Sequence, residues 1–398
     1  MRLTQKAPKL GDLVSLTSLR AVKTVQQRYT PSEDLLGLLE QFRCMINDCL
    51  RIGLAANVTS LKSLSLKAYN QLSGYDVMSY YKLCAISRAA GILRSYRKAK
   101  RRRRAVAEPY ARRPQLVTCY GLKIDNAKLQ LPFKPRRPIS IPLDKHTLDV
   151  LWKPNQTIRS ITLTTSIVGI TFSKEIIFKE PMGLVGIDSN LHNLTLVDSK
   201  GKIERYNLEE AARIKSKYQG VRSRLTRNDV RIRRRVFRKY GQKQHNIVSH
   251  IFHNISKHIV EDAKAKQFEI VMEKLTGLRR LYRKGNGQGS FHRGKLNSWS
   301  FRELQRQVEY KARWEGVPVV YVPARNTSRK CSICGLSMEP EENRTLKCPL
   351  HGMVDRDVNA ARNILARGLR FRPIALPIEA MVTASADMRE SVESMEAR

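Results

Sequence analysis

The stretch GLVGIDSN at residues 183–190 marks the point where the chain turns from short strands to alternating strands and helices. Its apolar run predicts a buried strand that ends near Asp188. A second run, FEIVMEKL at 268–275, predicts a strand that ends near Glu273, and PVVYVP at 318–323 predicts a third. Segments with helical character lie around them at 209–240, 242–266 and 300–316. Strands that alternate with helices predict an α/β layer.

The chain before this point has another pattern. Residues 12–30 alternate weakly, as a strand does, and from about residue 34 the apolar side chains recur at three and four, as in helices, which indicates a helical domain. Residues 111–180 return to short β-branched segments separated by turn residues. We therefore expect a multidomain chain, in which an N-terminal β domain is interrupted by a helical domain and followed by the α/β layer.

The charge of the chain points to a nucleic-acid partner. Its 398 residues include 74 Lys and Arg against 35 Asp and Glu, which gives a formal net charge of +39. Such an excess implies a polyanion. A membrane surface is the weaker alternative, because no apolar run of about 18 residues occurs. The N-terminus also lacks the long apolar stretch of a secretion signal.

Two basic runs are the strongest local evidence for nucleic-acid binding. RSYRKAKRRRR at 94–104 and RIRRRVFRKY at 231–240 interleave aromatic side chains with cations. Arg and Lys neutralise phosphates, and Tyr can stack on bases. A solvated helix face is the ordinary alternative, but too few acids alternate with these cations. The candidate contacts are Arg101, Arg102, Arg233 and Arg234. The sequence does not distinguish an RNA contact from a DNA contact.

A cysteine-rich segment lies near the C-terminus. Cys331 and Cys334 are separated by two residues, and after a gap of thirteen so are Cys348 and His351. Two such pairs can place four soft ligands around one tetrahedral Zn²⁺, with coincidence as the alternative. Because no position stays open, we expect a structural ion in an insert at 326–354. One metal site instead of a disulfide framework indicates the reducing cytoplasm.

Three carboxylates follow predicted elements. Asp188 and Glu273 end strands, and Asp357 begins a helix after the cysteine-rich segment. Acids that converge at the carboxyl ends of a sheet suit Mg²⁺, and two ions about 3.5–4 Å apart would act on a phosphodiester. Taken singly, each acid has an ordinary explanation: a strand end, a surface charge and a helix cap. Their combination on a basic chain favours catalysis.

The segment VDRDVNAARNILARG at 354–368 has two aspartates at the start of its helix. The small and apolar residues four, seven and eight positions after Asp357 share a helix face with it. Because that face must pack on the sheet, we expect Asp357 to point at the strand ends and Asp355 to point elsewhere. We therefore assign Asp355 a turn or cap. A cap role for Asp357 stays open.

Four stretches resemble successive motifs of the TnpB family, whose members are transposon-encoded RNA-guided DNA nucleases similar to compact type V CRISPR effectors. They are GIDSNLHNLTLVD, IVMEKLTGL, RNTSRKCSICG and DRDVNAARNILARG. The resemblance implies a RuvC-like, RNase H-type nuclease core with a zinc-ribbon insert, in which Asp188, Glu273 and Asp357 are the catalytic acids. This chain departs from the common pattern twice. The usual GIDxG reads GIDSN, and the second cysteine pair ends in His351.

The same resemblance implies how the chain is divided. Residues 1–30 and 111–180 would form a wedge-like β domain around a helical recognition domain at 31–110. The nuclease domain would comprise 181–325 and 355–370, on either side of the insert. The acid-richer tail at 371–398 is expected to be disordered.

The expected function is Mg²⁺-dependent cleavage of DNA by an RNA-guided endonuclease in the cytoplasm, near the nucleoid, of a prokaryotic-type cell. A guide RNA would pair with a double-stranded DNA target, while the protein holds the heteroduplex and reads a short flanking motif. Arg325 and Arg329 are candidates to approach the scissile phosphate, and a role in the local turn is the alternative. Two rival functions are a guide-dependent repressor that binds without cutting and a DNA-strand transferase. The sequence identifies no protein partner.

Overall fold

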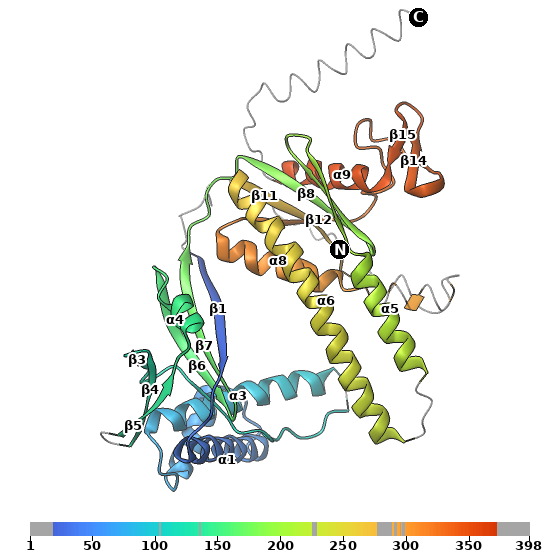
Figure 1. Cartoon of the computed structure of the whole chain (residues 1–398). Coiled ribbons are helices and arrows are strands. Elements are labelled where there is room, and N and C mark those ends of the chain that lie inside the picture. Colours follow the sequence, from blue (N-terminus) through green and yellow to red (C-terminus); the bar gives the residue numbers. More distant parts are fainter. Residues whose placement is uncertain are drawn as a thin grey trace, which may run out of the picture. The chain divides into compact units, whose positions relative to one another are not determined.

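The computed structural model describes residues 19–102, 105–134, 137–224, 229–276 and 299–371, with Gly289, Arg293, Gly294 and Leu296. Figure 1 follows the chain through their helices and strands. The chain divides into two compact units, Met1–Glu175 and Ile176–Arg398. Residues 1–18 lie outside the described residues, and so does the expected tail after Phe371.

The first unit contains two sheets and a group of helices. Its larger sheet has the strand order β1-β7-β6-β2, and its smaller sheet has the order β3-β4-β5. The strands are β1 (Leu19–Arg28), β2 (Gln115–Thr118), β3 (Lys123–Asp125), β4 (Lys128–Lys134), β5 (Arg137–Pro142), β6 (Gln156–Thr164) and β7 (Ile167–Ile176). Because β1 precedes the helices and β2 follows them, the prediction of a β domain interrupted by helices is confirmed.

The helices between β1 and β2 are amphipathic. They are α1 (Glu33–Ala55), α2 (Leu61–Ala68), the 3₁₀ turn η1 (Asn70–Leu72) and α3 (Ser79–Arg101). The buried stripe of α3 stops at Leu93, so its basic last turns are left to solvent. Helix α4 (Lys145–Leu151) was not predicted, because seven residues are too few to show a period. It begins where the carboxylate of Asp144 accepts a hydrogen bond from the backbone nitrogen of Thr147 at 2.7 Å.

The second unit is built on a five-stranded sheet in the order β10-β9-β8-β11-β12. Its strands are β8 (Gly183–Ser189), β9 (Asn193–Asp198), β10 (Ile203–Asn207), β11 (Phe268–Lys274) and β12 (Val319–Pro323). Strand β11 runs parallel to β8 and β12, and β9 is antiparallel to both of its neighbours. This is the topology of an RNase H-type fold, so the predicted fold class is confirmed.

Among the described residues, four helices accompany this sheet: α5 (Glu209–Ser223), α6 (Val230–Lys266), α8 (Phe301–Glu315) and α9 (Arg356–Phe371). The predicted division into helical segments at 209–240 and 242–266 is wrong, because α6 begins only at Val230 and runs through Gly241 for 37 residues. One glycine costs a helix about 1 kcal/mol, which packing overcomes. The true start is set by Asp229, whose carboxylate accepts a hydrogen bond from the backbone nitrogen of Arg231 at 2.7 Å.

Alternation along the strands gives the sheet two apolar faces. One packs against α6 and α8, and the other packs against α9 (Figure 1). Leu184 and Val271 belong to the second face, where both pack with Ile364. Because strand side chains alternate, residues an even number of positions further on share that face. Asp188 and Glu273 meet this condition and therefore lie on the α9 side.

Strand β8 and helix α9 approach each other closely at a glycine. A Cβ atom on Gly186 would lie 2.5 Å from the backbone oxygen of Ala361, a distance no side chain tolerates. Glycine here lets α9 lie directly on the strand, with Ala361 and Ile364 fully buried. The predicted packing of this helix face on the sheet is confirmed. It also fixes where the first turn of α9, with Asp357, stands relative to the strand ends.

A small insert connects β12 to α9. Its three strands, β13 (Glu339–Pro340), β14 (Thr345–Cys348) and β15 (Gly352–Asp355), pair antiparallel in that order, with the 3₁₀ turn η3 (Glu342–Arg344) between the first two. The buried apolar cluster of the insert consists of Cys331, Met338, Leu346 and Cys348. So small a core needs another source of stability.

Candidate active site

Two of the predicted acids end neighbouring parallel strands. The register of β8 and β11 pairs Ile187 with Met272, so Asp188 and Glu273 come side by side one residue further along. The exposed fraction is 7% for Asp188 and 8% for Glu273. A charged side chain is buried only where something offsets the loss of its hydration. Two such carboxylates at one place therefore require an explanation.

The third acid, Asp357, lies in the first turn of α9 and is 5% exposed. Its neighbour Asp355 caps that helix. One carboxylate oxygen of Asp355 accepts hydrogen bonds from the backbone nitrogens of Asp357 and Val358, both at 2.9 Å. Asp355 also pairs with Arg205 on the surface at 2.7 Å. The predicted cap role of Asp355 is confirmed, so the carboxylate of Asp357 is not needed to cap the helix.

Asp188 is the carboxylate most affected by the other two acids. Burial raises the pKa of Asp188 from its ordinary value of 3.8 to about 7, and the charges of Glu273 and Asp357 add to the rise. Burial also raises the pKa of Glu273, although a hydrogen bond and a nearby arginine oppose it. Burial acts in the same direction on Asp357, but hydrogen bonds from two neighbours outweigh it and lower the pKa. A cation would relieve this repulsion.

Two partners of the acids come from the insert and its entry. Arg344 donates hydrogen bonds to both oxygens of Asp357, at 2.5 and 3.2 Å. The hydroxyl of Thr327 donates to a carboxylate oxygen of Glu273 at 2.5 Å. No spacing or periodicity marks either residue, although Thr327 lies inside the stretch RNTSRKCSICG. The insert therefore contributes a cation and a hydrogen-bond donor to the group of acids.

Two further partners come from the turn between β8 and β9. Asn190 donates a hydrogen bond to Asp188 at 2.7 Å, and Asn193 donates one to Asp357 at 3.0 Å. Both asparagines closely follow Asp188, which ends a predicted strand, and this position could have been recognised from the sequence. Their partners could not be read from it, because Asn193 and Asp357 meet only through the fold.

Asparagines also tie α9 to the start of the insert. Asn359 is fully buried, its amide donates to the backbone oxygen of Lys330, and its oxygen accepts from the backbone nitrogen of Ser332, both at 2.8 Å. One turn later, Asn363 donates to the backbone oxygen of Thr327 at 2.8 Å. These bonds hold the cysteine-rich segment beside the helix that carries Asp357.

The donor set fits a hard divalent cation, for which carboxylate and amide oxygens are the preferred protein ligands. The side-chain oxygen of Asn193 is buried and has no hydrogen-bond partner among the described residues. It leaves an acceptor beside Asp357 for a water molecule or an ion. Arg344 already supplies positive charge there, so a cation must share Asp357 with Arg344 or displace it.

The predicted zinc ligands lie together. The ligand atoms of Cys331, Cys334, Cys348 and His351 are all within 4.8 Å of one another. The sulfur of Cys348 is 3.5 Å from that of Cys334 and 3.5 Å from Nδ1 of His351. A tetrahedron with zinc–sulfur bonds of about 2.3 Å has edges of about 3.7 Å. The group can therefore hold zinc, and it is the one such compact group in the described part of the chain.

Replacing Cys348 by serine is expected to release this ion and unfold the insert locally, because the ligands make up much of its core. Elemental analysis should give about one zinc per chain in the unmodified protein and far less in the variant. Cys119→Ser, which changes an exposed cysteine outside the group, is the matched control. Active protein that contains no zinc would contradict the assignment.

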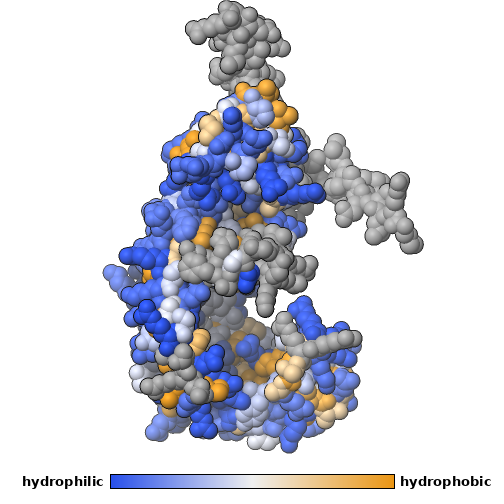
Figure 2. All heavy atoms as spheres, turned by 90° about the vertical axis from the view of Figure 1, so that its right-hand side faces the viewer, coloured by the Kyte–Doolittle hydropathy of each residue, from blue (hydrophilic) through white to orange (hydrophobic). Residues whose placement is uncertain are grey.

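The candidate arginines are all exposed. Arg101 and Arg102 end α3, Arg233 and Arg234 lie near the start of α6, and Arg325 and Arg329 follow β12. Their guanidinium groups are accessible to a polyanion. The arginine that donates a hydrogen bond to Asp357 is a different residue, Arg344. Figure 2 shows hydrophilic side chains over most of the coloured surface in view. No helix in the described segments is long and apolar enough to cross a membrane.

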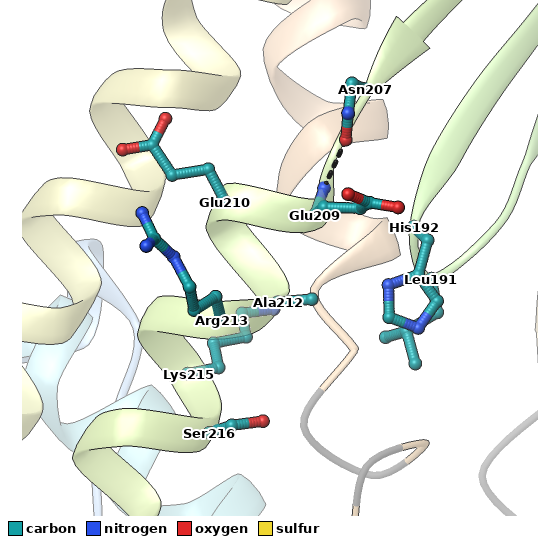
Figure 3. Close-up of a pocket in the computed structure, with 9 residues that line it drawn as sticks. All are labelled: Leu191, His192, Asn207, Glu209, Glu210, Ala212, Arg213, Lys215 and Ser216. Atoms are coloured by element: carbon teal, nitrogen blue, oxygen red, sulfur yellow. Dashed lines mark hydrogen bonds between the residues drawn. The ribbon is translucent and has the colours of Figure 1, made fainter.

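A hollow of about 780 Å³ adjoins the turn between β8 and β9. It is lined by Leu191, His192, Asn207, Glu209, Glu210, Ala212, Arg213, Lys215 and Ser216 (Figure 3). Burial lowers the pKa of Lys215 to about 8, and its amine donates to the hydroxyl of Ser300 at 2.7 Å. Two acids, Glu209 and Glu210, and two cations, Arg213 and Lys215, line this hollow, so it has no single sign of charge.

Comparison with known proteins finds relatives over most of the chain. The family described as "Cas12f1-like, TNB domain" matches residues 301–364, from α8 through the insert into α9. A TnpB-like protein of Methanocaldococcus jannaschii is 27% identical over 278 residues, which cover 66% of this chain and 99% of that protein. The CRISPR-associated endodeoxyribonuclease Cas12f2 of a Micrarchaeota archaeon is 32% identical over 199 residues, or 46% of this chain and 36% of that protein.

A solved structure has the same fold. The cryo-EM structure of a Cas12f1–sgRNA–target DNA complex matches with a TM-score of 0.58, covering 83% of this chain and 82% of that chain. Only 14% of the aligned residues are identical. The match extends well beyond the RNase H-type sheet, because it covers most of both chains.

Proposed function

The chain belongs to the TnpB family, and from this premise we propose that it is a transposon-encoded, RNA-guided DNA endonuclease. The observation that carries the proposal is the meeting of Asp188, Glu273 and Asp357 at one end of an RNase H-type sheet. A structural role does not account for them, because buried like charges destabilise a fold.

For the cofactor we propose two Mg²⁺ ions held by Asp188, Glu273 and Asp357. Bound there, they would activate a water molecule and stabilise the leaving oxygen of a phosphodiester. The protein's own part is to hold the oxygens in place, and Thr327 does this for Glu273. Arg344, whose side chain is 49% exposed, can reach both Asp357 and a phosphate of the strand to be cut.

Zn²⁺ is the proposed ion of the Cys331, Cys334, Cys348 and His351 group, with a structural role. Four protein ligands leave no position for a substrate. The ion would stabilise the insert that delivers Arg344 to the acids. The zinc ion would therefore affect catalysis indirectly, by stabilising the fold of residues 326–354.

The nucleic-acid part of the proposal rests on the net charge of +39. A guide RNA would supply sequence specificity by pairing with the target strand of double-stranded DNA, while the protein holds the heteroduplex. The proposed phosphate contacts are Arg101, Arg102, Arg233, Arg234, Arg325 and Arg329. We assign recognition of the flanking motif to the β domain and the helical domain of residues 1–180, before the nuclease domain and its insert.

Two rival functions are less well supported. A guide-dependent repressor that no longer cuts would be marked by loss of an acid, and all three acids are present and buried. A DNA-strand transferase can also use an RNase H-type core, but the cysteine-rich insert directly before Asp357 favours the nuclease. No disulfide joins the described cysteines, and we propose that the enzyme acts in the reducing cytoplasm, near the nucleoid of a prokaryotic-type cell.

The chain is expected to purify with a bound structured RNA, because so many positive charges need neutralising. Absorbance at 260 nm and sequencing of that RNA are the measurements. Affinity for the RNA should fall by roughly a thousandfold between about 50 and 200 mM salt. Replacing the segment of the RNA that pairs with DNA should then move the cut to the matching target. Protein that carries no RNA and binds none transcribed beside its gene would contradict the proposal.

A further inference from the structure

The turn between β8 and β9 brings one asparagine to each catalytic aspartate. Nδ2 of Asn190 donates a hydrogen bond to Oδ2 of Asp188 at 2.7 Å, and Nδ2 of Asn193 donates one to Oδ2 of Asp357 at 3.0 Å. The turn itself is closed by the backbone, since the nitrogen of Asn190 donates to the oxygen of Asn193 at 2.9 Å. Closing the turn therefore does not need the two side-chain amides.

The backbone conformation does not need asparagine at either position. Neither Asn190 nor Asn193 has a positive φ, which is the usual structural reason for asparagine in a tight turn. Both side-chain amides instead donate hydrogen bonds to the two aspartates.

Each amide restrains a carboxylate in a defined way. Asn190 engages one oxygen of Asp188 and leaves the other for an ion. Asn193 must present its nitrogen to Asp357, because its oxygen would be repelled by the carboxylate. The oxygen of the same amide is buried and has no hydrogen-bond partner among the described residues, so it remains an unused acceptor next to the carboxylate.

We infer that Asn190 and Asn193 are positioning residues, which fix the orientations of Asp188 and Asp357 for binding divalent cations. The inference rests on the proposed function and concerns how its metal site is organised. A carboxylate that is already oriented loses less freedom when it binds an ion, and partners of metal ligands typically change metal affinity by about 10- to 100-fold. If the asparagines only stabilised the turn, their loss would lower thermal stability and leave metal affinity unchanged.

The test compares Asn190→Ala and Asn193→Ala with Asn207→Ala in the full-length, RNA-bound protein. Asn207 is the partner of Asn193 on β10, is exposed, and accepts a hydrogen bond from the backbone nitrogen of Glu209 at 2.7 Å. Its truncation costs local stability without touching an acid. Zinc content and binding of target DNA should be the same in all three variants.

The main readout uses Fe²⁺ with ascorbate and hydrogen peroxide, which generate hydroxyl radicals that cut the polypeptide next to a bound ion. Fragments that end near Asp188, Glu273 and Asp357 report how far this site is occupied by the ion. The measurement does not detect ions bound to the RNA and does not depend on DNA cleavage. In the two variants at the turn, the Fe²⁺ concentration for half-maximal fragmentation should rise by about 10- to 100-fold. The Mg²⁺ concentration for half-maximal DNA cleavage should rise by the same factor, and saturating Mg²⁺ should restore most of the rate.

An unchanged Fe²⁺ midpoint in both variants at the turn would overturn the inference, while Mg²⁺-dependent cleavage by the unmodified protein would leave the proposed function standing. A shift as large in Asn207→Ala would also overturn it. Absence of these fragments in the unmodified protein would overturn the inference, and absence of Mg²⁺-dependent cleavage as well would overturn the proposed function. If an alanine variant loses zinc or RNA, Asn190→Ser and Asn193→Ser, which keep a hydroxyl donor, are measured against the same outcomes.

Discussion

Asp188→Asn is expected to abolish DNA cleavage, by about a thousandfold or more, while guided binding to the target stays within about twofold. The reason is that Asp188 is 7% exposed and so can hold a metal ion but cannot contact a duplex. Cleavage and binding are measured on the same RNA-bound preparation. Glu273→Gln and EDTA should have the same effect on cleavage.

The control for this substitution is Glu209→Gln, which removes an exposed carboxylate at the start of α5 and should cut normally. Cleavage that persists in Asp188→Asn, or in EDTA, would rule out the group of acids as the cutting site. Loss of binding together with cleavage would instead indicate a folding defect, which zinc content and thermal unfolding reveal.

The same substitution is expected to stabilise the protein in EDTA at neutral pH. Burial, with the charges of Glu273 and Asp357, raises the pKa of Asp188 from 3.8 to about 7. Between these values the folded protein keeps a proton that the unfolded chain has released, so the stability contributed by this group falls as pH rises through about 7. Asparagine is uncharged and avoids that loss. The unfolding temperature of the variant should exceed that of the unmodified protein at about pH 8 and match it at about pH 4.

Asp357→Asn is expected to lose almost all cleavage, whereas Asp355→Asn should keep most of it. Asp357 is 5% exposed and lies beside the other acids. Asparagine keeps its shape but removes the negative charge that would hold a metal ion. Asp355 serves as the N-cap of α9, a position where asparagine is about as good as aspartate. Its ion pair with Arg205 is between side chains 52% and 44% exposed, and such pairs contribute about 0–1 kcal/mol.

The pair of variants is matched, because both change one carboxylate to an amide within the same turn. Single-turnover cleavage at saturating Mg²⁺ is the measurement, with target binding as the check on folding. The reverse result, with Asp355 essential and Asp357 dispensable, would mean that α9 presents a different face to the strand ends than the one described.

Local pattern was sufficient for much of the fold. Periodicity of two or three to four residues marks the strands ending at Asp188 and Glu273 and the helical domain, because that signal lies within neighbouring residues. It failed for α4, which is too short to show a period, and at Gly241, where packing carries α6 through a residue that only weakly breaks helices.

The sequence by itself determined which chemical groups are present: three acids at the ends of elements, and three cysteines with a histidine at metal-ligand spacing. The cysteines and the histidine can be recognised as one metal site from their short spacings, because the two pairs lie within a small insert. Helix periodicity also separated Asp357 from Asp355, since two residues correspond to about 200° around a helix.

Only the tertiary structure decided what surrounds the acids. Arg344 reaches Asp357, Thr327 reaches Glu273, and Asn193 reaches Asp357 across 164 residues of chain. These contacts depend on the close approach of α9 to β8 at Gly186, a matter of ångströms between elements far apart in the sequence. A periodic pattern specifies which face of an element is buried, but not what it is buried against. The partners that set charge and orientation at the site are therefore fixed by packing and have no local signature.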